Sequence, residues 1–175
     1  MQETGRSLRV LITEREIQQR VRELAEAIDR DYPEGILYLV GVLKGAAIFL
    51  ADLVRAVRRP VRLDFIGISS YGAAKTSSGE VRLTKDLDVS IAGAHVLVVE
   101  DIVDTGLTLR YLLRLLSSRQ PRSLRVVALL DKRERRVCEV PVDYVGFVIP
   151  DQFVVGYGLD YAEDYRGLRD ICVLE

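Results

Sequence analysis

Residues 96–109, VLVVEDIVDTGLTL, indicate how the chain is organised. Four apolar residues, 96–99, are followed directly by Glu100 and Asp101, and a third carboxylate, Asp104, comes soon after. A short apolar run rich in β-branched residues is typical of a strand that is covered on both faces of a parallel sheet. Open parallel sheets bind ligands at the carboxyl ends of their strands. We therefore expect these carboxylates to lie in a binding site.

The turn after Asp104 has the form of an anion site at a helix N-terminus. It consists of Thr105, Gly106, Leu107 and Thr108. Successive backbone N–H groups and two hydroxyls at such a terminus would hold an anion. Carboxylates beside an anion site repel a purely anionic ligand, so we expect a ligand that also carries sugar hydroxyls or a metal. A ribose 5-phosphate meets this condition; the alternative is an ordinary helix start after solvated acids.

This stretch resembles the phosphoribosyl diphosphate motif of the type I phosphoribosyltransferases, and EDIVDTG at residues 100–106 is similar to the hypoxanthine-guanine branch of bacterial type. The resemblance extends from about residue 8 to residue 174. It implies an α/β fold in one domain over residues 1–175: a twisted, mainly parallel sheet flanked by helices, a flexible lid loop, and a small hood built from the termini, mainly residues 150–175. It also implies a glycosyltransferase of purine salvage. Such an enzyme uses Mg²⁺ and 5-phosphoribosyl 1-diphosphate to convert hypoxanthine or guanine to IMP or GMP, releasing pyrophosphate through an oxocarbenium-like transition state.

Hydrophobic patterns elsewhere fit the same α/β class. Thr13 and Glu16 have the spacing of a capping box before an amphipathic helix. Further helices are expected over residues 46–57 and 107–118. Strands are expected over residues 36–42, 61–69, 96–99, 123–130 and 145–149. The helix over residues 46–57 is apolar nearly all round, so part of it is expected to meet another subunit in a homodimer or homotetramer.

Lys44 and Gly45 form a second turn between a predicted strand and a predicted helix. A lone lysine at such a turn is often only a solvated loop charge, and no GxxxxGK[ST] pattern is present, which argues against a nucleoside triphosphate loop. The resemblance implies that Lys44 and Gly45 contact pyrophosphate. It also implies that the peptide bond between them is often in the strained cis form.

Residues 70–85, SYGAAKTSSGEVRLTK, are too small and polar to form a core, which predicts a mobile loop. On composition alone this is the tip of a disordered hairpin. The resemblance implies a lid that begins at Ser70 and Tyr71 and closes over the reacting centre. Exclusion of water would protect a carbocation-like intermediate.

The charged run DKRERR, residues 131–136, follows the strand expected over residues 123–130 and would otherwise be taken as a solvated loop. The resemblance implies that Lys132 donates to the exocyclic 6-oxygen of the purine. Phe153 would stack on the purine ring, and the backbone of Val154 would meet its edge. A lysine can only donate hydrogen bonds, so it suits hypoxanthine or guanine and mismatches the 6-amino group of adenine.

The remaining roles concern catalysis and metal binding. The resemblance implies that Asp160 holds Mg²⁺ and that Arg166 contacts pyrophosphate. Glu100 and Asp101 would hold the ribose hydroxyls and lie near a second magnesium ion. Asp104 would act as the general acid/base by accepting or sharing a proton from the imidazole edge of the purine.

Composition excludes several other classes of protein. The chain has 25 basic and 26 acidic residues, so no overall field draws it to nucleic acid or to an anionic membrane. Residues 1–10 lack the apolar core of a signal peptide, and a cytoplasmic protein is expected. Cys138 and Cys172 lack CxxC spacing and are expected to be packing residues, while His95 is expected on the surface.

Three alternatives share parts of this pattern. A regulator with a phosphoribosyltransferase-like domain would need a basic patch or an added DNA-binding segment. A pyrimidine-specific relative should lack the combination of Lys132 with Phe153 and Val154. A generic doubly wound binding module leaves unexplained why charged residues follow four of the predicted strands. The sequence therefore favours the purine enzyme.

Overall fold

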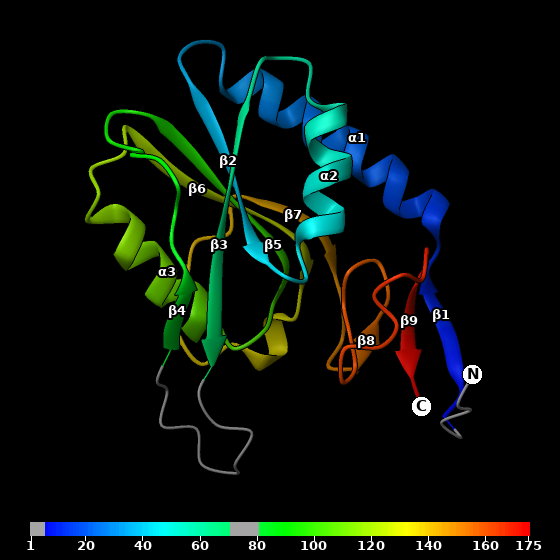
Figure 1. Cartoon of the computed structure of the whole chain (residues 1–175). Coiled ribbons are helices and arrows are strands. Elements are labelled where there is room, and N and C mark those ends of the chain that lie inside the picture. The colour runs from blue at the N-terminus through cyan, green and yellow to red at the C-terminus, as the bar shows by residue number, and fades with distance from the viewer. Residues whose placement is uncertain (1–5, 71–80) are drawn as a thin grey trace.

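The computed structural model describes residues 6–70 and 81–175 and contains two β-sheets (Figure 1). The larger sheet has six strands in the order β4-β3-β2-β5-β6-β7, and only β4 runs antiparallel to its neighbour. Its strands are β2 (Leu37–Leu43), β3 (Arg62–Ser70), β4 (Val81–Lys85), β5 (His95–Val103), β6 (Ser123–Asp131) and β7 (Tyr144–Val148). The predicted mainly parallel sheet is confirmed.

Helices cover both faces of this sheet, as Figure 1 shows. They are α1 (Glu14–Asp31), α2 (Ala47–Ala56) and α3 (Leu107–Ser117). Side chains alternate between the two faces along β5: Leu97 and Val99 pack in one core cluster with α1 and α2, and Val98 packs in the other with α3. This burial on both faces explains why the central strands read as continuous apolar runs.

The start of α1 is fixed by the predicted capping box. The Thr13 hydroxyl accepts the backbone N–H of Glu16, and Glu16 Oε2 accepts the backbone N–H of Thr13 at 2.8 Å. Five side chains of α1 at helical spacing are buried: Ile17, Val21, Leu24, Ala25 and Ile28. The helix therefore packs on the sheet through one face, as the sequence pattern indicates.

A smaller antiparallel sheet joins the two ends of the chain. Its strands, in the order β1-β9-β8, are β1 (Leu8–Ile12), β9 (Ile171–Leu174) and β8 (Val154–Val155). We call this sheet, together with residues 150–170, the hood. The sequence analysis expected no strand over residues 171–174, where the structure has β9. The run ICVL is a strand because it pairs with β1, with Leu8 opposite Leu174.

The predicted lid is partly corrected. Val81–Lys85 forms strand β4, which pairs with β3, because apolar and polar residues alternate along VRLTK and its odd positions are partly buried. Ser70 is the last residue of β3. Tyr71 and the rest of residues 71–80 lie outside the described residues, so the lid stays a prediction.

The expectation that His95 lies simply on the surface is also corrected. His95 is partly buried as the first residue of β5, its Nδ1 lies 2.5 Å from the Ser123 hydroxyl, and its ring packs edge-on against Tyr32 at 5.5 Å. Both cysteines are free thiols, and Cys172 is buried in β9. In residues 6–70 and 81–175, no helix is long and apolar enough to cross a membrane.

Candidate active site

Glu100 and Asp101 lie on the part of β5 that extends beyond β2. The pairing of β2 with β5 ends at Gly41 and Val99, whereas β5 continues beside β6 as far as Val103. The predicted strand end at residue 99 was therefore too early, because a strand with one remaining neighbour can still carry charged side chains. The carboxylates lie at the carboxyl end of a central strand, the position that an open parallel sheet offers a ligand.

Burial changes the acidity of this carboxyl pair. Glu100 is only 6% exposed, and this burial, with the negative charge of Asp101, raises the pKa of Glu100 well above its ordinary value. Burial also raises the pKa of Asp101 to about 6, although the backbone N–H of Ile102 donates to its Oδ1 at 2.7 Å. Hydroxyl donors or a cation beside these groups would favour their ionised forms.

The loop after Asp104 combines a tight turn with the start of α3. Gly106 is the N-cap of this helix and has φ of +87°, a conformation that favours glycine. A cavity of about 210 Å³ opens here, and its polar lining comes from both motif segments: Glu100, Asp101, Asp104, Thr105, Gly106 and Thr108. The carboxylates and the helix N-terminus therefore share one cavity.

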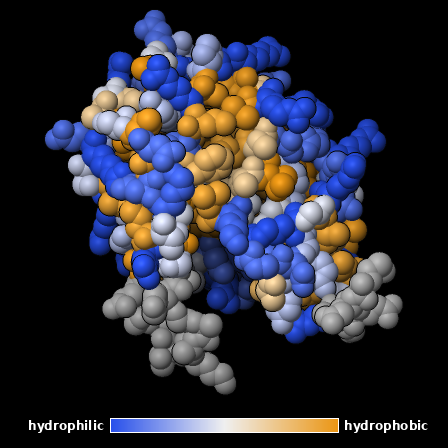
Figure 2. Space-filling view, in the orientation of Figure 1, coloured by the Kyte–Doolittle hydropathy of each residue, from blue (hydrophilic) through white to orange (hydrophobic). Residues whose placement is uncertain are grey.

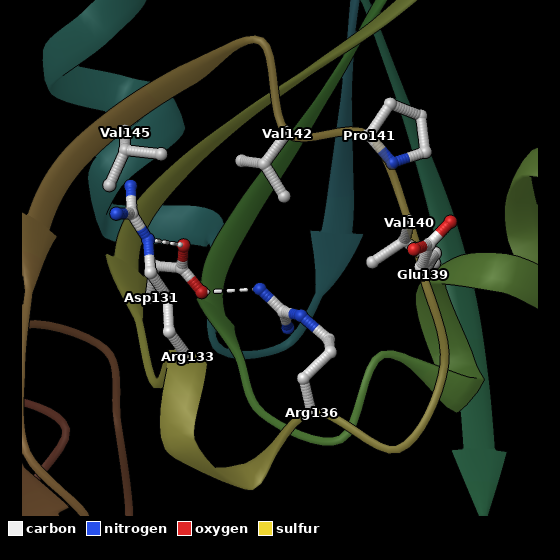
Figure 3. A pocket seen from close by; sticks show the side chains of 8 residues that line it. All are labelled: Asp131, Arg133, Arg136, Glu139, Val140, Pro141, Val142 and Val145. Atoms are coloured by element: carbon white, nitrogen blue, oxygen red, sulfur yellow. Dashed lines mark hydrogen bonds and ion pairs between the residues drawn. The ribbon is translucent and has the colours of Figure 1, made fainter.

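The loop is held in place by the segment after β6. Arg136 Nη1 donates to the backbone oxygen of Asp104 at 2.9 Å, and the N–H of Val137 donates to that of Thr105 at 3.0 Å. Arg136 is in turn paired with Asp131, which is 3% exposed and also contacts Arg133 at 3.2 Å (Figure 3). The sequence analysis did not identify this support. The sequence feature that could have indicated this support is an acid at the end of β6 followed by several arginines.

A larger cavity, of about 760 Å³, is lined in part by this support (Figure 3). Asp131 and its two arginines line one side, and Val140, Pro141 and Val142 line another. None of the motif carboxylates on β5 and its loop lines it. We therefore place the candidate active site in the smaller cavity, where the chemically active groups converge.

Asp104 and Lys132 are joined through two residues that the sequence analysis missed. Arg135 Nε lies 3.0 Å from Asp104 Oδ1, and Arg135 Nη1 lies 3.7 Å from Asp151 Oδ2. The Lys132 ammonium lies 3.9 Å from the other oxygen of Asp151, and Lys132 is 7% exposed. Phe153 comes two residues after Asp151, is 52% exposed and packs edge-on against Tyr161 at 5.8 Å. Of the expected purine contacts, Lys132 thus belongs to the same ion-pair network as Asp104.

The loop after β2 brings Lys44 and Gly45 against both the sheet edge and the hood. A Cβ on Gly45 would lie 1.8 Å from Asp101 Oδ2, and one on Gly158 would lie 2.2 Å from the Gly45 carbonyl oxygen. Arg166 Nη1 donates to the carbonyl of Gly158 at 2.7 Å. Only glycines permit this close contact between the loop, β5 and the hood.

The cis peptide bond of this loop is Leu43–Lys44, and this corrects the expectation for the bond between Lys44 and Gly45. Neither bond precedes a proline, so the sequence carried no signal for which of the two would be cis.

A cluster of charged side chains lies at the junction of this loop and the hood. Arg166 Nη2 is 3.1 Å from both Asp160 Oδ1 and Glu163 Oε1, and the Lys44 ammonium is 2.9 Å from Glu163 Oε2. Hydrogen bonds from Lys44 and Arg166 lower the pKa of Glu163. Three of these residues were expected here. Glu163 was missed because nothing distinguishes it from the other acids of the tail.

The donor set at this junction suits a magnesium ion that is held mainly by a ligand. Within the described ranges, no group of three or more His, Cys, Asp or Glu side chains could hold a metal by itself. Asp160 and Asp101 are close enough that the charge of Asp160 raises the pKa of Asp101. Mg²⁺ is commonly bound by one or two carboxylates together with substrate phosphates and water. The residues fit that mode of binding.

Comparison with known proteins agrees with this geometry. The family model that describes the phosphoribosyl transferase domain matches residues 11–162. The chain is 48% identical over 167 residues to the hypoxanthine-guanine phosphoribosyltransferase of Bacillus subtilis, covering 95% of this chain and 93% of that protein. It is 52% identical over 166 residues to the protein of the same name from Dictyostelium discoideum, covering 93% and 92% of the two chains.

Among solved structures, a hypoxanthine phosphoribosyltransferase from Staphylococcus aureus matches with a TM-score of 0.92 and 46% identity, over 95% of this chain and 91% of that chain. These findings confirm the resemblance inferred from residues 100–106 and the predicted enzyme class. The chain belongs to the phosphoribosyl transferase domain family.

Proposed function

We propose that this protein transfers the 5-phosphoribosyl group of 5-phosphoribosyl 1-diphosphate to hypoxanthine or guanine, forming IMP or GMP and pyrophosphate. The relatives named for these bases support the choice of substrate. One observation carries the proposal: Glu100 and Asp101 share a cavity with the left-handed turn at Gly106 and the N-terminus of α3. Hydroxyl acceptors and an anion site in one cavity match a ribose phosphate.

The sugar phosphate is bound by the two parts of the motif. Glu100 and Asp101 accept hydrogen bonds from the 2- and 3-hydroxyls of the ribose. The 5-phosphate binds the backbone N–H groups and hydroxyls of the loop, which consists of Thr105, Gly106, Leu107 and Thr108. The partial positive charge at the N-terminus of α3 favours the phosphate.

The purine is recognised between the end of β6 and the hood. Lys132 donates to the 6-oxygen, Phe153 stacks on the ring, and the backbone of Val154 meets its edge. The exposed ring of Phe153 and the buried ammonium of Lys132, 7% exposed as a residue, suit these two roles. Because Lys132 can only donate, the site disfavours the 6-amino group of adenine.

Asp104 acts as the general acid/base in the reaction. It accepts or shares the proton of the imidazole edge and makes the attacking nitrogen more electron-rich. The ribose becomes oxocarbenium-like, and the leaving diphosphate gains negative charge, which Lys44, the backbone of Gly45 and Arg166 stabilise. When bound at Asp160, and at a second position near Glu100 and Asp101, Mg²⁺ supplies further neutralisation of the diphosphate.

The test is release of pyrophosphate from 5-phosphoribosyl 1-diphosphate and Mg²⁺, with hypoxanthine, guanine, xanthine, adenine and uracil compared in parallel. Rapid release with hypoxanthine or guanine, and little with adenine or uracil, is expected. Release with uracil alone would support the pyrimidine alternative. No release with any base, despite binding of 5-phosphoribosyl 1-diphosphate, would favour a regulator instead.

We further propose that the protein forms a homodimer or homotetramer through the face that includes α2. Figure 2 shows apolar side chains gathered over this helix, and Ile48 of α2 and Leu63 of β3 are 43% and 46% exposed. Exposed apolar groups of this kind often mark a subunit interface. Light scattering of the purified protein measures its mass directly, and a monomer at all concentrations would contradict this proposal.

A further inference from the structure

Glu163 binds both cations that the proposed function assigns to the diphosphate. One of its carboxylate oxygens lies 2.9 Å from the Lys44 ammonium, and the other lies 3.1 Å from Arg166 Nη2. A single carboxylate therefore bridges two positive side chains that belong to different parts of the chain, the loop after β2 and the hood. This is the geometry expected of a bound oxyanion.

The charges at this junction make simultaneous occupancy unfavourable. Asp160 lies 3.1 Å from Arg166, so Asp160 and Glu163 together already balance the charges of Lys44 and Arg166. A diphosphate brought to the same cations would meet the Glu163 carboxylate at close range, and like charges repel. The Glu163 side chain is 64% exposed, so it is free to turn into solvent when another anion arrives.

The backbone places Glu163 at the tip of a specific turn. Tyr161 and Asp164 pair as an antiparallel bridge, and the two residues between them, Ala162 and Glu163, have φ of 51° and 71°. Turns with two left-handed residues are normally built from Asn and Gly. Asp160 Oδ2 accepts the N–H of Glu163 at 2.9 Å and holds this conformation. A costly backbone conformation is thus maintained at the site, which points to a function for its side chain.

We propose that Glu163 is an internal stand-in for the diphosphate, a carboxylate that occupies Lys44 and Arg166 and is displaced when pyrophosphate or 5-phosphoribosyl 1-diphosphate binds. This inference rests on the proposed function of these two cations. Glu163 keeps both side chains at their positions before substrate arrives. It also lowers the affinity of the site for pyrophosphate and so favours release of that product.

If Glu163 only ordered Lys44 and Arg166, removing its charge would weaken the binding of pyrophosphate. If it competes with pyrophosphate, removing its charge should strengthen that binding. Glu163→Gln keeps the shape of the side chain and the turn while removing the charge. Binding of inorganic pyrophosphate to the full chain is measured by calorimetry, with and without Mg²⁺. We expect Glu163→Gln to bind pyrophosphate about threefold to tenfold more tightly, the size of effect typical of exposed ion pairs. Unchanged or weaker binding would overturn the inference.

Two controls separate this result from other causes. Glu23→Gln removes a comparable exposed pair, with Arg20 at 2.8 Å, far from the site, and should leave pyrophosphate binding unchanged. Lys44→Ala should weaken binding, because it removes one of the two cations. If the unaltered chain and Lys44→Ala bind pyrophosphate equally, the proposed subsite itself is wrong. If Lys44→Ala weakens binding but Glu163→Gln does not strengthen it, only the stand-in role is wrong.

Discussion

Two regions contribute to the same site in different ways. One is the hood, and the other is the group of residues at the carboxyl ends of β5 and β6 and in the loops that follow them, which we call the sheet edge. At the sheet edge three charged residues are buried, with Glu100, Asp131 and Lys132 between 3% and 7% exposed, although the Asp104 side chain is 42% exposed. In the hood the corresponding groups are open to solvent: Phe153 is 52% exposed, and the Glu163 side chain is 64% exposed. The sheet edge therefore fixes geometry, whereas the hood offers groups that can rearrange around a ligand.

The two regions also make their left-handed turns differently. The loop at the sheet edge uses Gly106, with φ of +87°, and Arg136 holds it from behind. The hood has left-handed glycines too, Gly156 and Gly158 with φ of 99°, but its turn between Tyr161 and Asp164 uses Ala162 and Glu163, which are not glycines. Glycine adopts a left-handed conformation without strain, so the loop at Gly106 needs no further support for its φ. Ala162 and Glu163 are strained in that conformation, and the hydrogen bond from the Glu163 N–H to Asp160 holds it. Substitutions in the two regions should therefore differ in size and in kind.

The largest effect is expected at the sheet edge, at Asp104. Asp104→Asn keeps the shape but removes the proton acceptor, so turnover should fall by a factor of about 10² to 10⁴. Binding of 5-phosphoribosyl 1-diphosphate should stay near normal, because Asp104 is assigned to the base. Steady-state kinetics with calorimetry of substrate binding measures both quantities. Unchanged turnover would remove Asp104 from its catalytic role.

The purine contacts allow a direct comparison of the two regions. Lys132→Ala, at the sheet edge, should weaken purine affinity by about tenfold to a hundredfold and reduce the preference for 6-oxopurines, because a charged hydrogen bond is lost. Phe153→Ala, in the hood, should weaken all purines alike and by no more than about tenfold. Inhibition constants of hypoxanthine and adenine check both variants. An effect of Lys132→Ala on stability alone would support the solvated-loop interpretation.

The support behind the loop should matter for stability. Asp131→Asn leaves the guanidinium of Arg136 without its charge partner. Because the Arg136 side chain is only 19% exposed, the free energy of unfolding should fall by about 2 kcal/mol. Glu139 lines the same cavity from an exposed position, so Glu139→Gln should change the free energy of unfolding by less than about 0.5 kcal/mol. Urea unfolding measures both variants. Equal changes in the free energy of unfolding for the two variants would mean that the buried Asp131 does not stabilise the sheet edge more than an exposed residue does.

The smallest effects are expected from the backbone of the two turns, and they have opposite signs. Gly106→Ala should destabilise by about 1 to 2 kcal/mol, because an alanine is strained at this φ and its Cβ would lie 3.0 Å from Arg136 Cδ. Ala162→Gly should stabilise slightly, by about 0.5 kcal/mol, because it relieves the left-handed conformation. Thermal unfolding of the pair measures both. Effects of the same sign would contradict the comparison of the turns.

The sequence predicted the central sheet better than its surroundings. The apolar runs of β2, β5 and β6 and the capping box at Thr13 are local signals, and local signals are visible in a sequence. Strands β1 and β9 were missed because each is stabilised by pairing with the other, at the opposite end of the chain, as in the pair of Leu8 with Leu174. Strand β4 was hidden in a stretch whose average composition is polar.

The candidate site divides in the same way. Residues in a recognisable motif, such as Asp104 and Gly106, were assigned from the sequence and lie together in one cavity. Arg135, Asp151 and Glu163 act through ion pairs between distant segments, and such pairs leave no pattern in the sequence. Charged residues that connect parts of a site therefore become visible only once the fold brings them together.

One competition experiment tests the central claim most directly. The protein is given 5-phosphoribosyl 1-diphosphate, Mg²⁺ and an equimolar mixture of hypoxanthine, guanine, adenine and uracil, and the nucleotides formed are identified by mass spectrometry. Because the bases compete for one site, the products report relative kcat/KM values. We expect IMP or GMP, or both, without appreciable AMP or UMP. Formation mainly of AMP or UMP, or of no nucleotide, would contradict this assignment.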